Sequence, residues 1–329
     1  MMGGASLLYD KLVSIISPCF NGGKYLDDYF TGILSQKHKN IELIFVNDGS
    51  TDDTEEKALK YGELLKKQGM RFKYIYQDNS GQAAAINKGL RLFSGDFLTW
   101  LDSDDIMLPE NISKKLEFLM KNSEYGFAVS EIRYVNENDI GTSVGSARRI
   151  KPNSEDDFFK DLIYSHNVVW GPGTILVRRE VVIAAIPNLQ IYESREGQNW
   201  QLMLPITYYS KAGYVEEELL KVVCHNDSHS RSVRALEDNL KREESFIDIC
   251  QRTIRDINGM CNSEKEYWCR EVRIHHHLNC LRMSGFELEF TKYKSYRTLL
   301  LNDNYDISLK DSIILFPLRR VLSKVIHRK

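Results

Sequence analysis

The sequence predicts an α/β protein, with a mostly parallel central sheet flanked by helices and a helical C-terminal region. From residue 12 to about 230, short apolar segments alternate with helical ones, as in parallel strands joined by crossover helices. From about residue 235 the segments become long, polar and helical. The composition, 42% hydrophobic and 27% charged, is ordinary for a globular protein. We therefore expect an α/β domain over residues 1–232 and a helical region over residues 233–329.

Four segments are short, β-rich and nearly continuously apolar, as central strands covered on both faces are. These expected strands are LVSIIS (12–17), IELIFV (41–46), FKYIY (72–76) and FLTWL (97–101). The helices expected between them and in the C-terminal region are residues 24–35, 52–67, 82–93, 235–257, 264–284 and 289–301. Ligands of such sheets bind beyond the carboxyl ends of the strands, so the loops after these strands are the predicted site.

Net charge, hydrophobicity and cysteine spacing indicate which partners and which cellular compartment to expect. The net charge of −2 gives no indication of nucleic-acid binding, and no run of 18 apolar residues predicts a membrane-spanning helix. The start, MMGGASLLYDKL, lacks the features of a signal peptide, and the six cysteines form no CxxC pair. We therefore expect a cytoplasmic protein with reduced thiols and no zinc site. HHH at 275–277 is a weak metal candidate because neighbouring helix positions do not share a face.

The segment PLRRVLSKVIHRK (317–329) predicts a basic amphipathic helix that begins at Pro317, where no N–H is needed. Its apolar stripe consists of Leu318, Val321, Leu322, Val325 and Ile326. Such a helix can lie on an anionic membrane, here the inner face of the plasma membrane. The stripe also suits the protein's own core or a second copy of the chain, and the sequence leaves these alternatives open.

Turn-forming, small or acidic residues follow each expected strand. SPCFNGGKYL (17–26) and VNDGSTDDT (46–54) contain glycine turns and helix-capping residues, and QDNSGQAAAINKG (77–89) has small residues that allow close approach. In LDSDD (101–105), Asp102 and Asp104 can turn both carboxylates toward one hard cation, Mg²⁺ or Mn²⁺, that bridges to a substrate's phosphates. The alternative is a solvated acidic turn that caps the helix beginning near Pro109.

Together and in this order, these loops indicate a protein family far more specifically than any one of them does. SIISPCFNGGKYL, IELIFVNDGSTDDT, NSGQAAAINKGL and GDFLTWLDSDDIMLP resemble successive motifs of the family 2 glycosyltransferases, whose nucleotide-diphospho-sugar-binding fold is called GT-A. The resemblance is strong over about residues 12–135 and continues more weakly to about residue 232. It implies a nucleotide-diphospho-sugar donor, usually UDP-linked, a divalent metal at the aspartate pair, and transfer with inversion.

The resemblance also implies roles for single residues. Asp104 would bind the metal, and Asp102 the metal or the ribose. His225 or His229 would complete the metal shell, and His229 matches the family pattern better; surface histidines in a polar loop are the alternative. The donor site would be lined by Pro18, Phe20, Asn21, Asp48, Asn79, Gly81, Ala84, Asn87, Lys88, Asp102, Ser103 and Arg231.

Two positions depart from the family pattern. Ile86 stands where many relatives have arginine, so a basic contact to the nucleotide is missing or comes from Lys88. In SREGQNWQLMLP (194–205), Gln198 and Asn199 stand where relatives often have an acidic pair whose second member is the catalytic base. This stretch is similar to a GQNWQ-bearing subgroup among bacterial surface-polysaccharide enzymes.

An amide cannot accept a proton at neutral pH, so the base must be another group. Glu196, three residues before Asn199, is the first candidate and Glu193 the second. The alternative is that both are solvated loop charges, with Gln198 and Asn199 binding acceptor hydroxyls. Trp170 is a further candidate, either to stack on a sugar or to fill the core.

The sequence thus predicts hexosyl or hexosaminyl transfer to a hydroxyl of a glycan, or of a lipid-linked glycan, in bacterial surface polysaccharide synthesis such as that of capsule or O-antigen. One rival is a non-catalytic nucleotide-sugar or glycan-binding protein, which the missing acidic pair favours. The other is a sugar nucleotidyltransferase. That class usually has a basic glycine-rich loop, for which residues 17–26 offer only Lys24.

Overall fold

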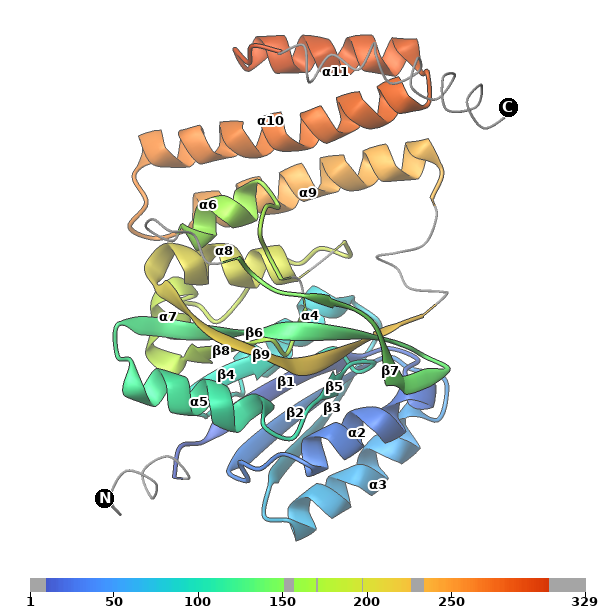
Figure 1. The fold of residues 1–329 in the computed structure, drawn as a ribbon, viewed down its shortest axis with the longest axis vertical. Helices are drawn as coiled ribbons and strands as arrows, with labels where there is room; N and C mark the ends of the chain where they lie inside the picture. The colour runs from blue at the N-terminus through green and yellow to red at the C-terminus, as the bar shows by residue number, and fades with distance from the viewer. Residues whose placement is uncertain (1–9, 151–156, 170, 197, 226–233, 308–329) are drawn as a thin grey trace. The chain divides into compact units, whose positions relative to one another are not determined.

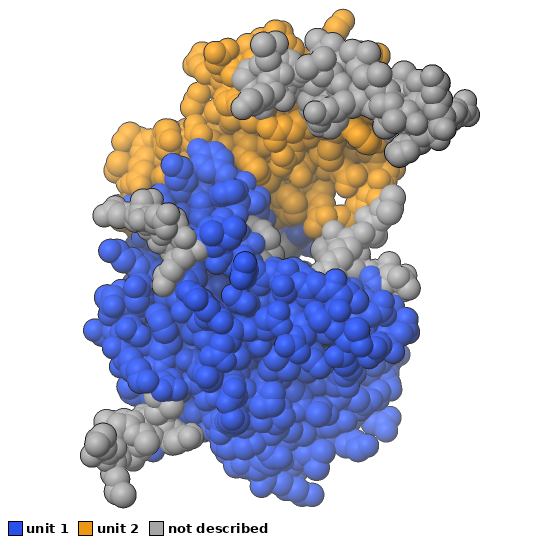
Figure 2. Space-filling view, in the orientation of Figure 1, with its two compact units in different colours: residues 1–231 blue, residues 232–329 orange. Residues whose placement is uncertain are grey.

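The computed structural model describes residues 10–150, 157–169, 171–196, 198–225 and 234–307 (Figure 1). The chain separates into two compact units, residues 1–231 and residues 232–329 (Figure 2). The first unit holds a nine-stranded sheet. Its strands are β1 (Val13–Cys19), β2 (Ile41–Asp48), β3 (Arg71–Gln77), β4 (Phe97–Trp100), β5 (Ile106–Met107), β6 (Tyr125–Asn136), β7 (Asp139–Ala147), β8 (Ile175–Arg178) and β9 (Lys211–Cys224).

Eight strands lie in the order β3-β2-β1-β4-β8-β6-β9-β5, and β7 pairs with β6. The pairings of β1 with β2, β1 with β4, β2 with β3, and β6 with β9 are parallel. β8 pairs antiparallel with both of its neighbours, as do β5 with β9 and β7 with β6. The predicted fold class, a sheet flanked by helices with a helical C-terminal region, is confirmed, but the sheet is mixed because only its first half is wholly parallel.

Burial along the predicted strands follows this order. β1, β2 and β4 are buried at every residue, as predicted for central strands. FKYIY (72–76) was predicted to be central as well, and this is wrong. β3 lies at the edge of the sheet, with Tyr76 54% exposed, because its second side has no strand to pair with among the described residues.

Helices connect the strands of the first unit. They are η1 (Gly23–Tyr25), α2 (Leu26–Leu34), α3 (Thr54–Lys67), α4 (Gln82–Leu90), α5 (Asn111–Lys121), α6 (Phe158–Ile163), α7 (Arg179–Ala185) and α8 (Asn199–Tyr209). The stripe predicted over 24–35 is the buried face of α2, where Phe30 stacks on Phe45 of β2 and on Tyr61 of α3. This packing fixes α2 and α3 against one face of the sheet (Figure 1).

The described residues of the second unit form a stack of three helices, α9 (Leu236–Asp256), α10 (Asn262–Phe286) and α11 (Phe290–Asn302). Leu278, Leu281 and Leu300 are part of its small core. In the HHH triplet of α10, His276 Nδ1 lies 2.7 Å from Glu243 and His277 Nε2 lies 3.8 Å from Glu244. These two histidines therefore pair with carboxylates of α9.

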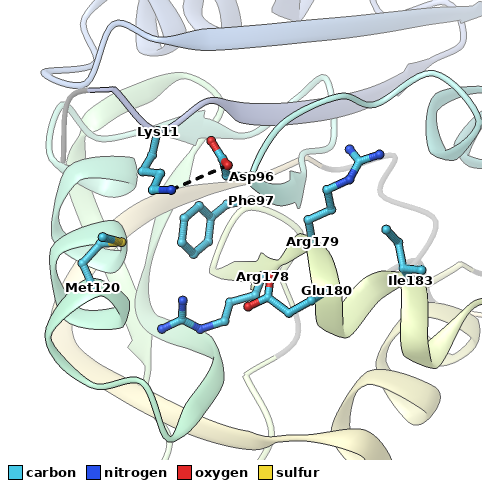
Figure 3. A pocket seen from close by; sticks show the side chains of 8 residues that line it. All are labelled: Lys11, Asp96, Phe97, Met120, Arg178, Arg179, Glu180 and Ile183. Atoms are coloured by element: carbon cyan, nitrogen blue, oxygen red, sulfur yellow. Dashed lines mark ion pairs between the residues drawn. The ribbon is translucent and has the colours of Figure 1, made fainter. Parts of the chain in front are cut away.

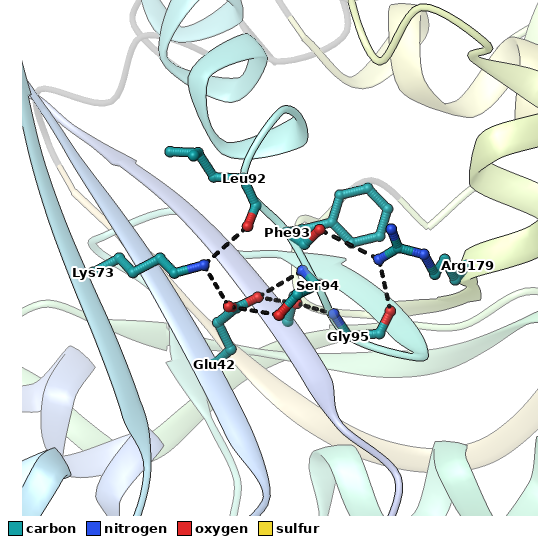
Figure 4. A network of polar contacts seen from close by, with 8 residues as sticks. Glu42, Lys73, Leu92, Phe93, Ser94, Gly95 and Arg179 are labelled. Carbon is teal, nitrogen blue, oxygen red and sulfur yellow. Dashed lines mark hydrogen bonds and ion pairs between the residues drawn. The ribbon is translucent and has the colours of Figure 1, made fainter.

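A buried carboxylate sets the position of β4, the strand that leads into the LDSDD loop. Glu42 of β2 is 1% exposed and accepts hydrogen bonds from Ser14 Oγ at 2.6 Å, Ser94 N at 2.8 Å and Lys73 Nζ at 2.7 Å (Figure 4). Arg179 holds the same turn through the carbonyls of residues 93 and 95. Burial raises the pKa of the Glu42 carboxyl, but the hydrogen bonds outweigh burial and the net pKa is lowered.

We expect Glu42→Gln to lower the free energy of unfolding at pH 7 by about 2–3 kcal/mol, because the amide loses charge-assisted bonds and turns a donor toward other donors. Since the folded pKa of Glu42 is depressed, this contribution is present above the unfolded pKa and is lost as the pH falls through the folded pKa. Urea unfolding at pH 7 and pH 3.5 measures both effects. Glu63→Gln, at an exposed position of α3, is the control. Equal stability of Glu42→Gln and the control at pH 7 would contradict the prediction.

Candidate active site

The loops after β1, β2 and β3 are tied to one another at the carboxyl ends of these parallel strands. Asn21 N donates to Ser50 Oγ at 2.9 Å, and Thr51 N donates to Asn21 Oδ1 at 2.8 Å. Gly49 has a φ of 78°, and a Cβ at this position would lie 2.7 Å from Asn79 N. The sequence signals for turns in these loops thus correspond to real close approaches, and the loops form one surface.

Asp48 shapes the loop that leads into α4. Its Oδ1 accepts from Gln77 Nε2 at 2.7 Å and Ser80 N at 2.8 Å, and its Oδ2 accepts from Gly81 N at 2.9 Å. The side chain is buried and most of its hydrogen-bonding capacity is used within the protein. The predicted contact of Asp48 with a base or ribose stays a prediction.

The three aspartates of LDSDD have different surroundings. Each offers an oxygen that lies within 4.8 Å of the others. Gln82 Nε2, at the start of α4, donates to Asp102 Oδ1 at 2.6 Å. Burial and the charge of Asp104 raise the pKa of Asp102 to about 7, against the opposing effect of Gln82. Asp105 is 5% exposed and accepts from Val223 N at 3.1 Å, so it joins this loop to β9.

His225 follows β9 and its side chain reaches Asp104. Its Nε2 lies 3.4 Å from Asp104 Oδ2, and its Nδ1 lies 3.1 Å from Glu137 Oε2. The ring centroid lies 4.2 Å from that of Tyr25. Asp104 raises the pKa of His225, burial lowers it and Glu137 raises it, and the net effect is an increase. The sequence favoured His229, which lies outside the described residues together with Arg231, whereas His225 is the histidine that the structure brings to the cluster.

This donor set fits a divalent cation. Asp102 and Asp104 offer carboxylate oxygens, and His225 Nε2 is a buried nitrogen with no hydrogen-bond partner among the described residues. Oxygen ligands with one imidazole suit Mn²⁺, and carboxylates alone suit Mg²⁺. Burial is the main cause of the raised pKa of Asp102 and repulsion from Asp104 is the second, and a bound cation would relieve this repulsion.

Residues predicted for the donor site divide into exposed and internal ones. Phe20, at the tip of β1, is 53% exposed, and Lys88 is exposed as well, whereas Pro18 and Ala84 are buried. Ser103 lies against the loop after β1, where a Cβ on Gly22 would approach its Oγ to 3.2 Å.

Asn87, predicted for the donor site, bonds to the segment that precedes α8. It is 1% exposed, its Nδ2 donates to Ile191 O and Glu193 Oε1 at 3.0 Å each, and its Oδ1 accepts from Ile191 N at 2.8 Å. Because its amide is used by the segment that precedes α8, Asn87 positions this segment on α4, and its place in the donor site stays a prediction.

Arg195 is a residue that the sequence reasoning missed. Its Nη1 donates to Asn79 Oδ1 at 3.0 Å and its Nη2 to Asn79 O at 3.3 Å, above Gly81 and the start of α4. Ile86, in the place of the family's arginine, is buried. The sequence SREGQNWQ places Arg195 two residues after Glu193, but only the fold brings it to Asn79 in the loop before α4.

The segment before α8 and the helix itself form the predicted acceptor side. Trp100 Nε1 donates to Asn199 Oδ1 at 3.1 Å, which holds this amide beside the end of β4. Gln198 is 4% exposed, and Glu196 is exposed, with its backbone N bonded to Ser194 Oγ at 3.2 Å. An apolar pocket next to Asn199 is lined in part by Trp100 and Met203. Trp170 lies outside the described residues.

A second cleft, of about 370 Å³, lies at the opposite ends of β1 and β4 (Figure 3). Its basic groups already have partners: Lys11 lies 3.7 Å from Asp96, Arg178 Nε donates to Tyr125 O, and Arg179 Nη1 donates to Phe93 O and Gly95 O. We therefore place the candidate active site at the LDSDD edge of the sheet.

Comparison with known proteins decides the family. The family model described as glycosyl transferase family 2 matches residues 14–184, which is more than half of the chain. The chain belongs to glycosyltransferase family 2. An uncharacterised glycosyltransferase of Rickettsia conorii is 37% identical over 149 residues, covering 45% of this chain and 23% of the relative. The putative teichuronic acid biosynthesis glycosyltransferase TuaG of Bacillus subtilis is 38% identical over 116 residues, covering 35% of this chain and 44% of TuaG.

Solved structures support the GT-A fold of this family 2 member. S. aureus TarS, residues 1–349 in complex with UDP-GlcNAc, superposes with a TM-score of 0.59 at 18% identity, covering 87% of this chain and 79% of that one. The mannosyltransferase PcManGT of Pyrobaculum calidifontis, in complex with GDP-Man and Mn²⁺, gives a TM-score of 0.55 at 13% identity, covering 94% and 79%. These likenesses show the fold. The matches to the two curated relatives span less than half of each relative's own length.

The comparisons leave the narrower GQNWQ subgroup as a prediction. Within the described part of this family 2 chain, no helix is long and apolar enough to cross a membrane.

Proposed function

We propose that this chain transfers a sugar from a nucleotide-diphospho-sugar, most simply UDP-linked, to an acceptor hydroxyl, with inversion and with Mn²⁺ or Mg²⁺ at the LDSDD edge. The observation that carries the proposal is the cluster of aspartates after β4, with the buried Nε2 of His225 3.4 Å from Asp104 Oδ2 and without a hydrogen-bond partner among the described residues. The fold neighbours TarS and PcManGT, which are seen with UDP-GlcNAc and with GDP-Man and Mn²⁺, support this class of donor.

Each part of the site has a proposed task. Asp102, Asp104 and His225 hold the cation, which when bound stabilises the charge that develops on the departing diphosphate. The exposed ring of Phe20 and the loop at Asn79 bind the nucleoside.

We further propose that the acceptor is a glycan or lipid-linked glycan of a bacterial surface polysaccharide. The relative TuaG, named for teichuronic acid biosynthesis, supports this class of acceptor. A basic helix over 317–329 that lies on an anionic membrane would bring the site to a lipid-linked acceptor, and this segment lies outside the described residues. An oligomer of the chain stays an alternative use of the same helix.

A panel of UDP-, GDP- and dTDP-sugars tests the donor proposal by thermal shift with Mn²⁺ and with EDTA, followed by detection of released nucleoside diphosphate. We expect one donor to stabilise the protein only with metal and to be turned over when an acceptor glycan is added. Metal-dependent binding without any release would favour the non-catalytic sugar-binding alternative, which the amides at Gln198 and Asn199 suggest. Metal-independent binding of every donor would overturn the metal assignment.

Arg195 supplies the basic contact that Ile86 cannot make. We expect Arg195→Ala to weaken binding of the nucleotide-sugar about 10-fold, because a charge-assisted contact contributes about 1.5–3 kcal/mol and Arg195 is exposed to solvent. Arg195→Lys should recover part of the affinity, since the charge remains and the two-pronged contact with Asn79 is lost. Isothermal titration with the donor measures this, and Arg91→Ala, just after the end of α4 and paired with Gln190, is the control. Unchanged affinity in Arg195→Ala would return the role to Lys88.

A further inference from the structure

We propose that Glu137, at the tip of the β6–β7 hairpin, is the positioning residue that orients His225 toward the metal. This inference rests on the proposed metal site and assigns a role to a residue outside all the motifs of the sequence. Glu137 lies 32 residues beyond Asp105 in the sequence, in the turn between β6 and β7.

The hairpin tip is built onto the end of β9. Asn136, the last residue of β6, pairs in register with Cys224, and Glu137 N donates to Cys224 O at 3.3 Å. His225 is the next residue after Cys224, so the pairing brings the glutamate to the histidine. Backbone hydrogen bonds therefore fix the position of Glu137 beside the end of β9.

The contact with Glu137 sets which nitrogen of His225 carries the hydrogen. A carboxylate only accepts, so the Nδ1 that lies 3.1 Å from Glu137 Oε2 must be the N–H. In neutral imidazole the lone pair is then on Nε2, which lies 3.4 Å from Asp104 Oδ2. A lone pair and a carboxylate that face each other repel unless something positive lies between them. Asp104 and His225 would hold one cation as two of its ligands, with Glu137 behind the histidine.

The ring of His225 has little freedom to turn away. Its side chain is 6% exposed, and Tyr25 packs on it with a centroid separation of 4.2 Å. Glu137 is itself 25% exposed at the side chain. A histidine held on one nitrogen by a carboxylate, with its other nitrogen aimed at a metal, is a common outer-shell arrangement that fixes the ring and raises its basicity as a ligand.

Binding of Mn²⁺ to the full chain, followed by EPR of the free ion, tests this role without any assay of transfer. The titration uses whichever of UDP, GDP and dTDP the wild type binds most tightly. We expect Glu137→Ala to weaken Mn²⁺ binding about 10- to 100-fold, as loss of such outer-shell partners does, and Glu137→Gln to weaken it less because the amide oxygen still accepts. Asp139→Asn is the control, because it removes a carboxylate two residues from Glu137 that bonds Gly141 N rather than His225. This variant should bind Mn²⁺ within about twofold of wild type.

A double-mutant cycle separates positioning from a general effect on the fold. If Glu137 acts through His225, then Glu137→Ala should have no further effect in a His225→Ala background. Wild-type affinity in Glu137→Ala, or full additivity of the two substitutions, would overturn the inference while leaving the proposed function intact. Absence of any Mn²⁺ binding by the wild-type protein would overturn the metal site and the inference together.

Discussion

Replacement of Asp104 by asparagine is expected to abolish metal-dependent donor binding while the fold stays intact. Loss of an outer-shell partner lowers metal affinity about 10- to 100-fold. Asp104 would contact the cation directly, so we expect its replacement to lower Mn²⁺ affinity at least about 100-fold. Transfer should fall by about 10³-fold or more, since metal stabilisation of a leaving group contributes several kcal/mol. Asp102→Asn should behave in nearly the same way.

The stability of these variants distinguishes a metal site from a structural acidic turn. Asp104 is 38% exposed at the side chain, and its charge is one cause of the raised pKa of Asp102. Removing that charge relieves repulsion, so Asp104→Asn should unfold at the same or a slightly higher temperature than wild type without metal. A turn that only caps a helix would instead lose stability, typically about 1 kcal/mol.

Isothermal titration of the wild type and both variants with UDP and Mn²⁺, with and without EDTA, provides the measurement. Asp28→Asn makes the same change of charge at an exposed position of α2 and is the matched control. If both site variants bind donor and metal with wild-type affinity, the metal assignment is wrong.

Glu196→Gln is expected to slow the chemical step about 10²- to 10⁴-fold, which is the usual contribution of a general base. Asn199 occupies the position where the family often has its base, and its Oδ1 already accepts from Trp100. Glu193 accepts from Asn87 and thereby holds the loop on α4. The Glu196 carboxylate is exposed and accepts no hydrogen bond found among the described residues, so it is the glutamate of the pair that is available to take a proton.

Single-turnover transfer at saturating donor isolates this step, after titration has shown that donor affinity is unchanged. Glu193→Gln is the paired control, and we expect a smaller loss of rate because the amide can replace the acceptor for Asn87. If both variants keep rates within about threefold of wild type, neither glutamate is the base, because loss of a general base slows the reaction far more. The search for the base would then move to Asp105, which is buried and accepts from Val223 N, and to Asp227, which lies outside the described residues.

The sequence by itself determined the strands and helices that carry the site, because their signals are local. Alternation of apolar β-rich segments with helical stripes located β1, β2, β4, α2 and α3, and the aspartates after β4 identified the edge of the sheet where a ligand binds. The family also followed from the order of short motifs along the chain, since each loop must fold in the same way to serve the same site.

Only the tertiary structure decided which distant residues complete the site. Glu137 and His225 are 88 residues apart and meet because β6 pairs in parallel with β9, a pairing that no local pattern encodes. Arg195 reaches Asn79 across 116 residues for the same kind of reason. Sheet order likewise moved FKYIY to an edge, because hydrophobicity indicates that a strand is buried on some face but not how many neighbours it has.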